Sequence, residues 1–250
     1  MSAASAILKL IADEGDPATQ DHLANQLRED GDLLAAVWRL ATEAGEPPPA
    51  LIHLVLGIDA PELIARYRIA DLEAGTWLLC WLDQPRRDHA GQGGASLDAL
   101  AERCNASTAS EVATYLRQQL GITGDRIDYH HPANSFMHRV LERRCGLPIT
   151  LTVLWMLLCQ RLGFTAEALC LPGHVVGRWD GGFLDLFEGG NAIDDQHIDR
   201  MCLAGGFVDP ARFLEPASER DLLQRMARNL VYAYRKREDA VRAEIATALS

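Results

Sequence analysis

The sequence predicts an α+β fold in which a helical N-terminal region is followed by a buried central helix, an antiparallel sheet and a long C-terminal helix. Apolar residues recur at intervals of three and four up to about residue 85, a pattern typical of amphipathic helices. Residues 149–162 are apolar almost all round, which favours a helix that is packed on most of its faces. Strand patterns then follow at 165–171, 174–179 and 183–187.

Residues 1–95 form the predicted N-terminal helical region. The apolar residues within 33–41 give one clear stripe of helical spacing. Asp16-Pro17 and the segment 45–49 combine turn or capping residues with proline, so we expect both to separate helices. Residues 85–96 are rich in charged, glycine and small polar residues, which predicts an exposed and mobile connection.

Residues 96–215 form the predicted core, which begins with short helices at 97–104 and 110–120. Asn134-Ser135 is expected to cap the next helix, and Gly146 to end it, since glycine adopts positive φ at low cost. Pro148 then opens the central helix.

The last predicted region is residues 216–250. Ser218 with Asp221 in the first turn matches a helix-capping pattern. Helical spacing continues to about Leu249, so we expect a single long helix to close the chain.

The composition argues against nucleic acid and membrane partners. A formal charge of −11 repels phosphate backbones over most of the surface. The longest apolar run, residues 149–159, is well short of the roughly 20 residues that span a bilayer. Because the N-terminus lacks the basic start and cleavage site of a secretory signal, we expect a cytoplasmic protein.

The sequence predicts neither a metal site nor a cofactor. The six cysteines contain no CxxC pair, so reduced and mostly buried thiols are expected. His130, His131, His138 and Cys145 match no compact zinc spacing, and we expect them to be structural or exposed residues.

A histidine and an aspartate are predicted to meet on the sheet. A two-residue turn at Asp180-Gly181 would pair Trp179 with Gly182. Side chains alternate between faces, so His174 and Asp185 would then share one face and lie diagonally opposite each other. A carboxylate beside an imidazole favours the charged form that acid–base catalysis needs. The alternative is structural: the histidine begins a strand, and the aspartate binds backbone at a sheet edge.

The segments NSFMHRVLERRCGLPITL, RLGF, LPGHVVGR and FLDLFEGG resemble the SirB-type branch of the transglutaminase-like superfamily. The resemblance covers about residues 61–234. It implies a papain-like core with a triad frame, in which the histidine position falls on His174 and the acid position on Asp185. The position of the nucleophilic cysteine falls on Pro148, two residues after Gly146, and this branch is similar in having proline there. The resemblance therefore implies that the usual nucleophile is missing.

Two other residues are candidate nucleophiles. Cys145 precedes Pro148 by three residues, and a displacement of several ångströms would ruin the geometry of attack. The hydroxyl of Thr150 would lie within the helix and would need a base within hydrogen-bonding reach. Neither residue is therefore a strong substitute for the missing thiol.

The motifs also suggest which residues border a binding cleft: Asn134, Glu142, Arg143, Arg144, Gly146, Gly173, His174, Asp185, Gly189 and Gly190. The arginines of this set, with Arg139, could bind an acidic peptide or carboxylate beside His174, or could pair within the protein. The internal partners that the sequence offers are Asp128, Glu142 and Asp194.

Three functions remain open from the sequence. The first is a catalytically inactive transglutaminase-like module that recognises a peptide or protein through the degenerate cleft. The second is a cysteine-type peptidase or amide-transferring hydrolase that uses a non-standard nucleophile such as Cys145. The third is a structural or assembly role carried by the N-terminal helices. The oligomeric state is not indicated.

Overall fold

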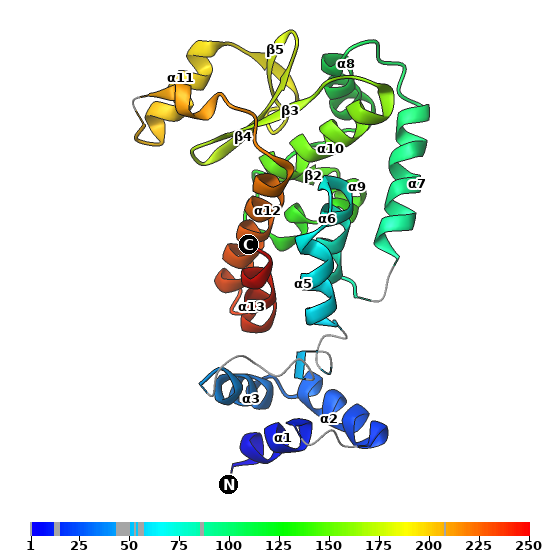
Figure 1. Ribbon diagram of the computed structural model, residues 1–250, viewed down its shortest axis with the longest axis vertical. Coiled ribbons are helices and arrows are strands. Elements are labelled where there is room, and N and C mark those ends of the chain that lie inside the picture. Colours follow the sequence, from blue (N-terminus) through cyan, green and yellow to red (C-terminus); the bar gives the residue numbers. More distant parts are fainter. Residues whose placement is uncertain are drawn as a thin grey trace.

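The computed structural model describes residues 2–12, 16–43, 51–52, 54, 58–85, 88–207 and 209–250. Figure 1 shows helices α1–α3 at one end and the β3–β6 sheet at the other. The sheet is small and most of the described residues are helical, so the predicted α+β class is confirmed. None of the helices within these ranges has the length and hydropathy needed to cross a membrane.

The N-terminal end consists of α1 (Ala3–Ala12), α2 (Pro17–Glu29) and α3 (Gly31–Glu43). As predicted, Asp16 separates two of these helices: its carboxylate accepts hydrogen bonds from the backbone amides that open α2. Helix α1 packs against α3. The second predicted break, at 45–49, lies outside the described residues.

Next come α5 (Ala60–Arg68), α6 (Leu72–Leu79), η1 (Cys80–Leu82) and α7 (His89–Glu102). The expectation of a mobile connection at 85–96 is wrong, because most of that segment belongs to α7. Asp88 caps this helix by accepting a hydrogen bond from the amide of Gly91. A Cβ atom at Gly93 would lie 2.5 Å from the ring of Trp77, so the glycine allows α7 to pack closely against α6.

The core continues with α8 (Ala109–Thr114), the π-helical turn η2 (Tyr115–Gln119), β1 (Thr123–Gly124), η3 (Pro132–Ser135), α9 (Met137–Arg143) and β2 (Cys145–Gly146). Strands β1 and β2 pair in parallel. This pairing fixes the backbone just before the central helix.

Both predicted boundaries of α9 are wrong. Asn134 lies in η3 and binds backbone carbonyls, while the N-cap position of α9 is Phe136. The helix ends at Arg144, which adopts the left-handed conformation at φ 60°. Gly146 is required for close packing instead, because a Cβ atom there would lie 2.8 Å from the side chain of Val140.

The central helix α10 (Pro148–Leu162) begins at Pro148 and ends at Gly163 (φ 77°), as predicted. Every residue from Pro148 to Trp155 is buried, which explains the absence of a polar face in its sequence. Trp155 is fully buried, and its indole N–H donates a hydrogen bond to the carbonyl of Ala109.

One antiparallel sheet follows, with strands β3 (Glu167–Leu171), β4 (His174–Trp179), β5 (Gly182–Asp185) and β6 (Asn191–Ile193) in sequence order. One face packs on α10 through residues such as Val175. The other face packs on α11 (Asp195–Ala204) through a separate small apolar cluster. The segment η4 (Pro210–Phe213) leads to the last helices.

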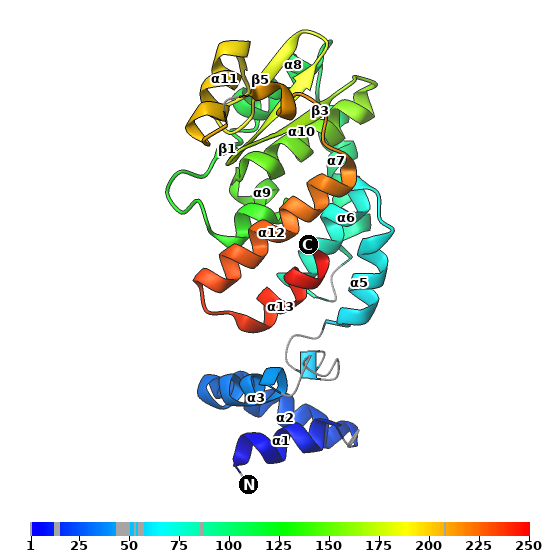
Figure 2. The ribbon, with the colours of Figure 1, turned by 60° about the vertical axis from the view of Figure 1, so that its left-hand side comes forward.

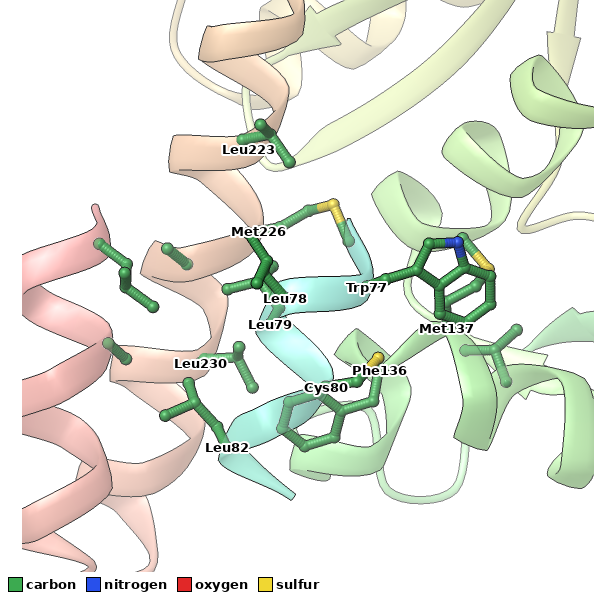
Figure 3. Close-up of a cluster of buried hydrophobic side chains, with 14 of the residues drawn as sticks. Trp77, Leu78, Leu79, Cys80, Leu82, Phe136, Met137, Leu223, Met226 and Leu230 are labelled. Carbon is green, nitrogen blue, oxygen red and sulfur yellow. The ribbon is translucent and has the colours of Figure 1, made fainter. Parts of the chain in front are cut away.

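The C-terminal region contains two helices, α12 (Glu219–Lys236) and α13 (Ala240–Leu249), rather than the single long helix expected. Ser218 and Asp221 form the predicted capping box. Glu238 adopts φ 60° and breaks the helix, after which α13 turns back against α12 (Figure 2). Figure 3 shows α12 packing against α6 through Leu223, Met226 and Leu230.

Candidate functional site

The sheet has the register that the sequence predicts. Trp179 pairs with Gly182, and Arg178 with Phe183. His174 therefore lies on the same face as Asp185, and its Nε2 atom is 3.0 Å from the Oδ2 atom of Asp185. The predicted contact is confirmed.

A tight turn and a half-buried arginine position His174. Pro172-Gly173 joins β3 to β4, with Gly173 at φ 71°, which glycine adopts without strain. Arg225 of α12 donates hydrogen bonds of 3.0 Å to the carbonyl oxygens of both Leu171 and His174. The edge of the Phe187 ring packs against the imidazole. The histidine is thus fixed by contacts from both α12 and the sheet.

Asp185 is almost completely buried, with 1% of its surface exposed. Its Oδ1 atom accepts hydrogen bonds from the amides of Phe187 and Glu188, at 3.0 and 3.1 Å. Burial acts to raise the pKa of this carboxyl, but the hydrogen bonds and the charge of His174 outweigh burial and lower the pKa. An ionised carboxylate therefore faces the imidazole, and the backbone contacts of the structural interpretation are also present.

The His174–Asp185 pair borders a cavity of about 1020 Å³ between the sheet and α11. The lining residues are Pro172, Gly173, His174, Asp185, Phe187, Glu188, Asn191, Ala192, Ile193, His197, Met201, Ala204 and Gly205. The apolar members come from both the sheet and α11, and Glu188, Asn191 and His197 add polar groups. None of these described lining residues has a thiol or hydroxyl side chain.

Pro148 is buried at the start of α10 and is not among the residues that line this cavity. From His174, aromatic contacts lead through Phe187 to Tyr129. The Tyr129 ring lines a second, smaller cavity together with Leu147. The Thr150 hydroxyl is buried within α10 and has no hydrogen-bond partner, so it is not accessible to a substrate.

Cys145 lies in β2 and is half-buried. Its Sγ atom is 3.9 Å from the Oδ2 atom of Asp125. Burial and the negative charge of Asp125 raise the pKa of this thiol, although Arg143 acts in the opposite direction. A reactive catalytic cysteine has a lowered pKa, so the surroundings of Cys145 disfavour a nucleophilic role.

The other predicted cleft residues do not line this cavity. Arg143 donates hydrogen bonds to Asn134 and Asp125, which ties α9 to the loop after β1. Glu142 pairs with Arg139, which also binds Asp83. The internal pairing considered for the arginines is thus present for Arg139 and Arg143, mostly with partners other than those the sequence suggested.

Gly189 and Gly190 form the turn between β5 and β6 at positive φ. The amide of Gly190 donates to the carbonyl of Asp185 at 2.7 Å, so the turn supports the site without lining the cavity. Arg144 is exposed at the end of α9. Of the predicted cleft residues, only Gly173, His174 and Asp185 line the cavity.

The sequence analysis missed the wall that α11 contributes. His197, Met201 and Ala204 of α11 line the cavity together with the His174–Asp185 pair. The available signal was the sheet alternation, since the face that carries His174 also carries the apolar residue Val176 and needed a covering element.

Comparison with known proteins supports the fold. Residues 92–228 match the family model described as the transglutaminase-like superfamily. A UPF0162 protein of Xylella fastidiosa is 39% identical over 140 residues, covering 51% of this chain and 50% of that protein. A UPF0162 protein of Vibrio cholerae is 33% identical over 93 residues, covering 35% of this chain and 34% of that protein.

F-box only protein 21 of Homo sapiens is 38% identical over 77 residues, covering 29% of this chain and 12% of that protein. This chain spans about half the length of the Xylella relative that it matches. No solved structure matches it. Since the family model covers more than half of the 250 residues, including α10 and the whole sheet, the chain belongs to the transglutaminase-like superfamily.

Proposed function

We propose that this chain is a non-catalytic transglutaminase-like module that binds a peptide or protein segment in the cavity beside His174 and Asp185. One observation carries the proposal: an ordered imidazole–carboxylate pair borders a cavity of about 1020 Å³ whose described lining residues include no thiol or hydroxyl. Covalent acyl transfer needs a nucleophile within about 3–3.5 Å of the carbonyl carbon. The cavity offers the base without the nucleophile.

The first residue of α10 also lacks a nucleophilic side chain. Pro148 occupies the position that the family resemblance assigns to the cysteine, and its ring has no group to ionise. The alternative thiol that the sequence offers, Cys145, has a raised pKa and does not line the cavity. We therefore expect no thioester chemistry.

The lining groups suit a peptide. The Nε2 atom of His174 is engaged by Asp185, which leaves Nδ1 to bind a backbone or side-chain amide. Glu188 and Asn191 add further polar groups, and Ile193 and Met201 offer a surface for an apolar side chain. A few convergent polar groups in a mostly apolar cavity are typical of a binding site.

The proposal is tested by selecting peptides from a random library on the wild-type protein. The peptides are then measured by calorimetry against His174→Ala and Met201→Glu. We expect both substitutions to weaken binding by 10-fold or more, on the order of 1.4 kcal/mol. His22→Ala, an exposed histidine on α2, is the matched control and should bind normally.

Ammonia release from glutamine-containing peptides and peptide hydrolysis are assayed in parallel. We expect no turnover by the wild-type protein. Turnover that disappears in His174→Ala would overturn the non-catalytic part of the proposal. Selected peptides that bind all three variants as tightly as wild type would overturn the location of the binding site.

A further inference from the structure

A second cluster of chemically active side chains lies away from the His174 cavity. Cys80 of η1, His89 at the start of α7 and His138 of α9 converge so that their potential ligand atoms all lie within 4.8 Å of one another. Cys80 is fully buried, His89 is 3% exposed, and the side chain of His138 is 10% exposed. The proposed peptide site uses none of these residues.

Each imidazole is held through its Nε2 atom. The Nε2 atom of His138 is 2.9 Å from the Oδ2 atom of Asp83. The Nε2 atom of His89 is 2.8 Å from the carbonyl oxygen of Gln84. Histidines that bind metals almost always use their second nitrogen to contact a carboxylate or a backbone carbonyl in this way.

The other ring nitrogen of His138, Nδ1, is the decisive atom. Nδ1 is buried and has no hydrogen-bond partner among the described residues. A buried polar atom without a partner is rare in folded proteins, because it loses its contact with water and gains nothing in return. A purely structural role satisfies Nε2 through Asp83 but leaves Nδ1 unexplained.

An ion could enter the cluster. His89 and His138 line a cavity of about 250 Å³ together with Gln92, Ser96 and Glu142. This cavity could hold a water molecule as a further ligand, or admit the carboxylate of Glu142. The thiol of Cys80 makes a long contact of 3.6 Å with the carbonyl of Thr76, which a bound ion could replace, and it lies beside the backbone amides of Met137 and His138 at the start of α9.

We propose that Cys80, His89 and His138 bind a zinc ion, with Asp83 and Gln84 orienting the two imidazoles. One thiolate and two imidazoles are ligands that zinc prefers, whereas magnesium and calcium require oxygen ligands. Zinc–ligand bonds of about 2.0–2.3 Å need donor atoms closer together than 4.8 Å, so small side-chain rotations complete the site. Binding forms a Zn–S bond and releases the thiol proton of Cys80 to solvent.

The ion would join three separate elements. Cys80 lies at the junction of α6 and η1, His89 begins α7, and His138 lies in the first turn of α9. A metal that binds only the folded arrangement stabilises it by mass action. The proposed role is therefore structural, with an open position toward the cavity.

The test uses the full chain, stripped of metal with a chelator and dialysed. Zn²⁺ is titrated in competition with a chromogenic chelator, and Co²⁺ serves as a spectroscopic substitute. We expect one zinc per chain, a thiolate-to-cobalt charge-transfer band and a higher melting temperature with zinc. Absence of stoichiometric zinc binding by the wild-type protein would overturn the proposal. A cobalt spectrum without the thiolate band would overturn it too, and neither measurement requires a variant that folds.

Three substitutions locate the site: Cys80→Ser, His89→Gln and His138→Gln. Each should weaken zinc binding by about 100-fold or more, since a ligand is removed, and Cys80→Ser should also abolish the charge-transfer band. Cys145→Ser and His22→Gln are the matched controls. Asp83→Asn keeps all three ligands and should weaken binding by about 10- to 100-fold. Zinc binding that the ligand substitutions leave unchanged would contradict the assignment.

Discussion

The Nε2 atom of His174 and the Oδ2 atom of Asp185 lie 3.0 Å apart across β4 and β5. The carboxylate also accepts two backbone hydrogen bonds, so it is held whether or not a ligand is present. The imidazole is fixed by this contact and by its place at the start of β4. The pair is therefore preorganised, which is what both catalysis and specific recognition require.

The Asp185 carboxylate should make stability depend on pH. Its pKa is lowered in the folded protein, whereas an unfolded aspartate has a pKa of about 3.9. The folded state thus gains stability above that value and loses this gain as the pH falls through the lowered folded pKa. Asp185→Asn should cost about 1.5–3 kcal/mol near neutral pH, because hydrogen bonds to a charged group are lost.

Urea unfolding of wild type and Asp185→Asn from pH 2 to pH 7 measures this effect. The difference in unfolding free energy should be largest above about pH 5 and shrink below about pH 4. Asp180→Asn, in the exposed turn of the same hairpin, is the control and should change little at any pH. A difference for Asp185→Asn that is constant over the whole range would contradict the lowered pKa.

Two adjacent glycines of α7 should respond in opposite ways to alanine. A Cβ atom at Gly93 would lie 2.5 Å from the Trp77 ring, so Gly93→Ala should destabilise the protein by about 1–3 kcal/mol. At Gly94 the nearest atom is a Glu73 carboxylate oxygen at 3.8 Å. Gly94→Ala should stabilise the protein by about 0.4–1 kcal/mol, because alanine restricts the unfolded chain.

Chemical unfolding of the two variants under identical conditions checks this pair. Equal changes of the same sign in the free energy of unfolding would mean that the packing of α7 on Trp77 does not determine the effect of alanine at these two positions. The comparison also tests whether the segment that was expected to be mobile is a packed helix in solution.

The sequence predicted those parts of the site that depend on residues close together in the chain. Asp180-Gly181 set the hairpin register, and the register placed His174 beside Asp185. The apolar run from Pro148 to the glycine at 163 likewise defined α10. In each case the deciding interactions lie within a few residues of one another.

The errors arose where tertiary contacts decide the structure. The glycines of 85–96 indicated flexibility, yet Gly93 is a helical residue at which a side chain would collide with Trp77. Glu238 adopts a left-handed conformation that its residue type does not favour, so the break between α12 and α13 was not visible in the sequence.

The candidate metal cluster was missed for a similar reason. Cys80 and His89 lie within ten residues of each other but form no compact zinc motif, and His138 comes from a distant segment. Only the packing of α6, α7 and α9 brings them together. Sequence spacing identifies a metal site when the ligands follow a compact motif, and a cysteine and a histidine nine residues apart match none.

Arg225 should hold the turn that precedes His174. It donates to the carbonyl oxygens of Leu171 and His174, and both hydrogen bonds cross from α12 to the sheet. Arg225→Ala should therefore speed hydrogen exchange of the β3–β4 hairpin while α12 stays protected. Arg228→Ala, at an exposed position of the same helix, is the control. Uniformly faster exchange throughout the protein would indicate a general loss of stability instead.

Cys145 should behave as an unactivated thiol. Burial and the Asp125 charge raise its pKa, and the thiolate is the reactive form, so alkylation should be slow below pH 8 and still increase at pH 9. Mass spectrometry after brief iodoacetamide treatment from pH 5 to pH 9 measures the rate at each cysteine. Asp125→Asn should speed labelling because it removes the negative charge, whereas His174→Ala should leave the rate unchanged. Rapid labelling near pH 6 that is lost in His174→Ala would favour the cysteine hydrolase, since it would mean that the histidine activates this thiol.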